Sequence, residues 1–173
     1  MLKKLCLVLF LSVVSLHAKS GVDVAKLILP SFSKGAVVSK QQFKLNAKEL
    51  KKVQQSAKAK IDTNLIRFYT VKKGKDIEGY AVLLLQVVRT KKAAVLYVIS
   101  PQESIKSIEI VAFMEPQEYK PKQGWKNTFK GKRKSDNLFA GKGVPTISGA
   151  TMTARAIADA SRIALAIVHL YKE

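Results

Sequence analysis

The segment between residues 65 and 113 limits most strongly what this chain can fold into. It is rich in branched and aromatic residues and is interrupted by short polar turns, which is the pattern of an antiparallel meander. Residues 83–88 are apolar on both faces of the expected strand, so other parts of the chain must cover both sides of the sheet. We expect at least three strands, at residues 80–88, 93–99 and 105–113, with turns at 89–92 and 101–103.

A helical pattern at the C-terminus provides one of these covers. Residues 153–170 place apolar side chains at helical spacing and polar side chains on the opposite side. His169 is explained by solvent exposure and by the dipole at the end of this helix, and we assign it no function. The apolar face comprises Ile157, Ala160, Ala164, Ile167 and Tyr171, and the polar face comprises Arg155, Asp159, Arg162 and His169.

Two shorter helices are expected before the sheet. Residues 22–32 are apolar, with Pro30 near their end, which favours a short helix packed on the body of the protein. Asn46 and Glu49 have the spacing of a capping box, so a second helix runs from there to about Lys60. The predicted fold class is therefore α+β: a twisted antiparallel sheet packed by a long C-terminal helix and shorter flanking helices.

Residues 1–18 have the pattern of a secretory signal peptide. Lys3 and Lys4 precede an apolar run, and Ala18 is a small residue suited to cleavage. The run is shorter than the roughly 20 residues that span a bilayer, but its retention as an N-terminal anchor stays open. We expect an exported protein, periplasmic or on the extracellular face of the cytoplasmic membrane.

The composition restricts the chemistry and the partners. Cys6 is the only cysteine and lies in the expected signal, so disulfides and thiolate metal sites are excluded for the mature protein. Two histidines make a haem or histidine-rich metal site hard to build, so redox chemistry needs a non-metal cofactor. The net charge of +19 fits a solvated basic surface or an anionic partner, and export with scattered lysines argues against nucleic acid.

The turn before the C-terminal helix is the strongest candidate for a binding site. Ser148, Gly149, Ala150 and Thr151 are small residues that bring hydroxyls to a helix N-terminus, followed by Thr153. The first N–H groups of a helix have no intrahelical partners, and the helix dipole favours an anion there. The residues alone leave two interpretations open, a phosphate site and an ordinary capped helix.

This turn resembles the flavinylation motif of the FMN-binding domain family, which is known from subunits of sodium-pumping quinone oxidoreductases, related ferredoxin-linked complexes and small exported flavoproteins. The resemblance extends upstream through Gly79-Tyr80, through the stretch 98–115 that ends in Glu115, and through the connector of Trp125, Phe129, Gly131 and Lys132. We therefore divide the chain into the signal at 1–18, an extension of the same domain at 19–78, and an FMN-binding domain at 79–173.

The resemblance implies FMN as the cofactor, joined by a phosphoester to Thr151. In the family a separate magnesium-dependent transferase makes this link with FAD as the donor. Carried over, Ser148, Gly149 and Ala150 shape the turn, Thr153 assists with the phosphate, and Glu115 and Trp125 join the cofactor-binding residues. Trp125 has a second interpretation, the anchoring of a loop to the core.

One position departs from the family pattern. The motif usually carries an aspartate three residues before the serine, and this chain has Pro145 there. Noncovalent FMN binding is therefore an alternative to attachment at Thr151.

No acid–base pair or nucleophile constellation points to a substrate reaction. We therefore expect an electron-carrier module with redox partner proteins, at the membrane as one option, rather than a self-contained enzyme. Two alternatives stay open: a cofactor-free or reversibly binding basic adaptor of the same fold, and an exported flavin reductase.

Overall fold

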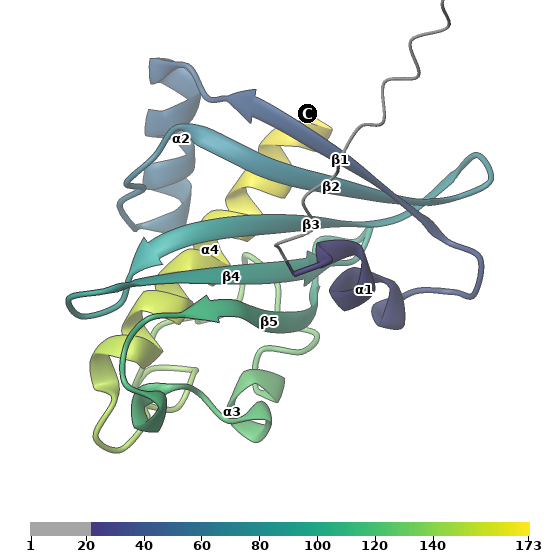
Figure 1. The fold of residues 1–173 in the computed structure, drawn as a ribbon. Helices are drawn as coiled ribbons and strands as arrows, with labels where there is room; N and C mark the ends of the chain where they lie inside the picture. Colours follow the sequence, from purple (N-terminus) through teal and green to yellow (C-terminus); the bar gives the residue numbers. More distant parts are fainter. Residues whose placement is uncertain (1–21) are drawn as a thin grey trace, which may run out of the picture.

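The computed structural model describes residues 22–173, so the expected signal peptide lies outside the described residues. Five antiparallel strands form one meander in the order β1-β2-β3-β4-β5, packed by helices (Figure 1). The predicted α+β class is confirmed. The elements are α1 (Val24–Ile28), η1 (Leu29–Ser31), β1 (Val37–Lys44), α2 (Ala47–Ala57), β2 (Leu65–Lys73), β3 (Asp76–Val87), β4 (Lys92–Ile99), β5 (Ile105–Phe113), η2 (Gln117–Tyr119), α3 (Gln123–Asn127) and α4 (Thr151–Lys172).

The strands expected at 80–88, 93–99 and 105–113 correspond to β3, β4 and β5. β3 begins earlier than expected, at Asp76, and the sheet has two further strands. The sequence does not predict β1, because this segment lacks the apolar alternation of a strand. In the structure six of its eight residues are exposed. It pairs with β2 along its whole length, from Val37 opposite Lys72 to Lys44 opposite Leu65. Lysines suit this edge strand because they discourage pairing with other chains.

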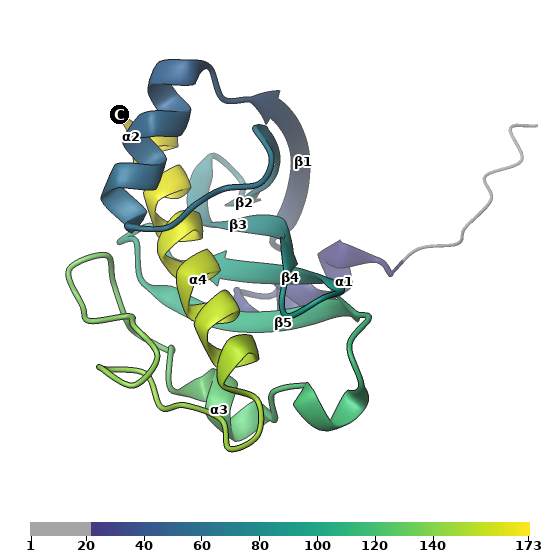
Figure 2. The same ribbon diagram turned by 90° about the vertical axis from the view of Figure 1, so that its left-hand side faces the viewer.

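Different helices cover the two faces of the sheet. α4 crosses one face with α2 beside it, and α1 lies on the other (Figures 1 and 2). Val82 and Leu84 belong to the core beneath α4, whereas Ala81 and Leu83 pack with Ile28 of α1. The expected double cover is incomplete, since Leu85 lies on the same face of β3 as Ala81 and Leu83 but is 45% exposed.

The capping box that opens α2 is present, with both reciprocal bonds between Asn46 and Glu49. α2 ends at Ala57, and Lys58 follows in the left-handed conformation with φ 49°. Val53 and Ala57 of its apolar stripe are buried against α4. Within residues 22–173 no helix is long and apolar enough to cross a membrane.

The expected polar face of α4 requires a correction at Arg162. Its side chain is buried, because α2 and the loop at Leu138 enclose this side of the helix. The guanidinium donates to the carbonyl oxygens of Ala57 and Leu138, both at 2.7 Å, and to Asp159 at 2.8 Å. One cation thus joins α4 to the end of α2 and to the loop that leads into the helix.

We predict that Arg162→Ala lowers the free energy of unfolding by about 3 kcal/mol, because it leaves two buried carbonyl groups without donors. Arg155→Ala removes an exposed arginine from the same helix and should change stability by less than about 0.5 kcal/mol. Urea unfolding of both variants measures the difference. Equal effects would contradict the structural role given to Arg162.

Candidate functional site

The first turn of α4 has unsatisfied backbone donors. No side chain caps this helix, although Ser148, Thr151 and Thr153 are all nearby in sequence. The N–H of Ala154 donates to Ala150 at 3.1 Å, whereas residues 151–153 find no backbone acceptor among the described residues. The ordinary capped helix is therefore the wrong interpretation of this turn. N–H groups without backbone acceptors and the positive end of a 22-residue helix favour an anion here.

The hydroxyl groups around this helix start lie in two different environments. Thr151 and Ser148 are exposed. Thr153 is fully buried, and its hydroxyl has no hydrogen-bond partner in the described part of the chain. A solvent-side phosphate can therefore reach the hydroxyls of Thr151 and Ser148, whereas the buried Thr153 is not accessible to it.

Gly149 gives the turn its shape. Its φ of 73° lies in the left-handed region, and a Cβ added to it would meet no atom within 4 Å. The following Ala150 is buried, and its N–H donates to Ile147 at 2.9 Å. The backbone at Gly149 is thus fixed on one side and open to approach on the other.

We predict that Gly149→Ala lowers stability by about 1 kcal/mol, since an L side chain strains the left-handed conformation even where space is free. Gly124→Ala provides the matched control, because Gly124 lies in α3 with equally open space and an ordinary φ. That variant should keep or gain stability. Thermal unfolding compares the stability of the two variants. A Gly149→Ala variant as stable as the wild type would contradict the backbone strain inferred at this position.

Trp125 connects α3 to the loop before the motif. Its indole Nε1 donates to the carbonyl oxygen of Pro145 at 2.8 Å. Its ring meets Phe129, which is fully buried, edge to face at 5.1 Å between centroids. The structure thus gives Trp125 the loop-anchoring role, and its contact with a flavin ring stays a prediction.

Glu115 organises the β3–β4 turn. One carboxylate oxygen accepts from the backbone N–H groups of Arg89, Thr90 and Lys91 at 3.1, 2.7 and 2.8 Å. The bonds from Lys91 and Thr90 hold the pKa of Glu115 below its ordinary value, against the rise that burial causes. Nothing in the sequence pattern indicated this local role, and cofactor contact by Glu115 stays a prediction.

The lowered pKa of Glu115 makes stability depend on pH. The pKa of Glu115 is lower in the folded protein than in the unfolded chain. Its contribution to the free energy of unfolding is therefore complete above about pH 4.5 and is lost as the pH falls through the folded pKa. We predict that the urea midpoint of the wild type falls more steeply below pH 4.5 than that of Glu115→Gln. Glu118→Gln, at an exposed carboxyl nearby, should keep the wild-type slope.

A small cavity beside α4 was not expected from the sequence. It has a volume of about 110 Å³ and lies between the end of β3, residues 60–63 and α4 at Ala156 and Ala160. Gln86 lines it, and its amide group is buried without a hydrogen-bond partner in the described residues. The predicted cofactor-binding residues are not among its lining residues.

Among residues 22–173 there is no cluster of three or more histidine, cysteine, aspartate or glutamate side chains that could hold a metal ion. A comparison with curated proteins gave no match. A comparison with family models matched residues 90–166 to the FMN-binding domain. The matched region contains β4, β5, the connector with Trp125, and the start of α4. The match supports the assignment of residues 90–166 to the FMN-binding domain family and indicates FMN as the cofactor.

Proposed function

We propose that this protein is an exported electron-transfer flavoprotein that carries FMN in a phosphoester bond to Thr151. The observation that carries the proposal is the exposed hydroxyl of Thr151 at the uncapped start of α4. The family match supports the cofactor, and the pattern of residues 1–18 supports export.

The residues at the turn fit the phosphate of FMN. The N–H groups of residues 151–153 lack acceptors in the described chain, and the open side of Gly149 lets an anion approach the backbone. Ser148 adds an exposed hydroxyl. An anion here also interacts favourably with the dipole of α4, so the attachment point and the electrostatics agree.

Attachment is a group transfer from FAD, catalysed by a separate magnesium-dependent transferase. The hydroxyl oxygen of Thr151 forms a new bond to the FMN phosphorus, the phosphoanhydride bond of FAD breaks, and AMP leaves. The hydroxyl proton passes to solvent. The exposure of Thr151 is what lets such an enzyme reach it.

Pro145 occupies the place of the family's usual aspartate. In this chain the Trp125 indole fixes the Pro145 carbonyl, so the loop is held by a hydrogen bond instead of a carboxylate. We propose that this bond suffices to present the turn to the transferase.

FMN passes one or two electrons, and the protein supplies position and electrostatics. The excess of lysine and arginine would attract an acidic redox partner or an anionic membrane surface. The chain then acts as a carrier between partner proteins, with no substrate reaction of its own.

Intact-mass spectrometry of the protein co-produced with a flavin transferase tests the proposal. We expect a mass gain of FMN minus one water and a fluorescent band on a denaturing gel, both lost in Thr151→Ala. Thr146→Ala removes another exposed threonine hydroxyl from the same loop and should keep both signals. The same spectrum shows whether the chain starts after Ala18.

A label that persists in Thr151→Ala would refute the attachment residue. Yellow protein that loses its colour on denaturation would replace the covalent link with noncovalent binding. Colourless protein in the presence of an active transferase would favour the adaptor alternative.

A further inference from the structure

A basic groove lies at the start of β5, and none of its lining residues belongs to the turn at 148–151. It has a volume of about 560 Å³ and runs between η1, the β4–β5 turn and the segment after α3. Three cationic side chains line it, Lys106, Lys130 and Arg133, and no carboxylate does. The groove adjoins the start of β5, whereas Glu115 follows the end of the same nine-residue strand. A strand of this length spans roughly 27 Å, so the groove is separate from the turn at Glu115.

Backbone hydrogen bonds build the wall of this groove. Ile105 donates to Lys132 at 2.9 Å, and Gly131 donates to Ile105 at 2.8 Å. Ser104 and Arg133 form an antiparallel bridge beside them. The fold therefore holds the main chain of Lys130 and Arg133 next to that of Lys106, although like charges repel.

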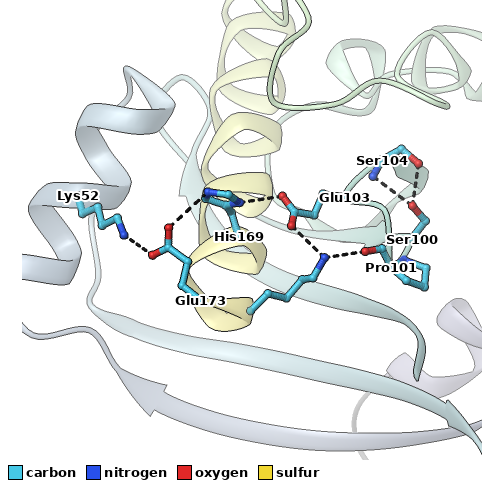
Figure 3. A network of polar contacts seen from close by, with 8 residues as sticks. Lys52, Ser100, Pro101, Glu103, Ser104, His169 and Glu173 are labelled. Carbon is cyan, nitrogen blue, oxygen red and sulfur yellow. Dashed lines mark hydrogen bonds and ion pairs between the residues drawn. The ribbon is translucent and has the colours of Figure 1, made fainter. Parts of the chain in front are cut away.

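The carboxylates of the neighbouring segments bond to groups other than the cationic ends of Lys106, Lys130 and Arg133. Glu103, in the β4–β5 turn, contacts His169 at 2.9 Å and Lys172 at 3.0 Å, as Figure 3 shows. Glu109 pairs with Lys126 at 3.1 Å. Asp136 accepts from the backbone N–H of Arg133 at 2.7 Å, and Glu78 accepts from the backbone of Ser33.

The residues that line the groove therefore carry an excess of positive charge. Within residues 22–173, Lys106, Lys130 and Arg133 form no ion pair. The Lys106 ammonium lies over the ring of Phe32, at 4.9 Å from its centroid. Glu78, which is held by Ser33, is near enough that Lys106 also helps to lower the pKa of its carboxyl. An anion placed between the three cations would relieve their mutual repulsion.

Hydroxyl groups complete the lining. Ser31 and Ser107 form one pair at 3.3 Å, and Ser100 and Ser104 form another at 2.7 Å (Figure 3 shows the second). In each pair one hydroxyl donates to the other, so the accepting hydroxyl keeps its own proton for a ligand. The groove thus offers both cations and neutral donors to an acceptor-only group.

We infer that this groove binds a phosphate-bearing anion, distinct from the FMN phosphate at Thr151. A phosphate matches the lining because it has up to two negative charges and several acceptor oxygens in a compact group. The volume leaves room for the organic part that carries the phosphate. Two sources share this chemistry, the headgroup of an anionic phospholipid and a soluble phosphate ester.

The test titrates the full chain with inorganic phosphate at low ionic strength, followed by amide NMR shifts. In parallel the chain is sedimented with phosphatidylglycerol or phosphatidylcholine vesicles. The groove variant combines Lys106→Gln, Lys130→Gln and Arg133→Gln. The control variant combines Lys40→Gln, Lys44→Gln and Lys48→Gln, which removes the same charge from exposed lysines of β1 and α2.

We expect the groove variant to lose at least tenfold in affinity, while the control variant changes less than threefold. Groove-dependent binding to phosphatidylglycerol vesicles identifies a lipid headgroup, and groove-dependent binding of phosphate alone identifies a soluble ester. The inference is overturned if the control variant loses as much as the groove variant. It is also overturned if the amide shifts that phosphate causes fall on residues 148–153 instead of on the groove, or if neither probe saturates on the wild type. Amide spectra confirm that each variant is folded.

Discussion

The position of α4 depends on one buried cation. Arg162 donates to the end of α2 and to the loop at Leu138 while its own helix lies across the sheet. A guanidinium can serve several acceptors at fixed angles, which a lysine in this place could not do. Because Leu138 belongs to the segment that returns to the start of α4, the same contact helps to fix where that helix begins.

The helix start then determines what the site can do. Its N–H groups have no acceptor in the described chain, which is costly in a buried place but tolerable beside water. An external anion satisfies these donors better than water because it also meets the helix dipole. By contrast, the capping box at the start of α2 already supplies acceptors for backbone N–H groups there, so a ligand finds fewer free donors at that helix.

Much of this architecture could be predicted from the sequence, because β3, β4, β5 and α4 carry strong periodic patterns. β1 could not, since its polar residues gain strand structure from pairing with β2. The burial of Arg162 and Thr153 depends on contacts from distant segments that local periodicity does not contain. At the site, the pattern and the resemblance located the turn, but the roles of Glu115 and Trp125 as backbone anchors required the structure.

Most carboxylates of this chain are already bonded to other groups, as Glu115 is, so most of its lysines and arginines have no acidic partner. Of the twelve acidic side chains, nine hold a backbone group or a cation in place. The lysines and arginines outnumber them at 31, so most cations have no carboxylate left to pair with. Surface charges farther apart than about 8–10 Å are largely screened at physiological ionic strength. Each cluster of cations therefore acts mainly on anions within this distance, which makes the local lining of a groove more important than the net charge of the chain.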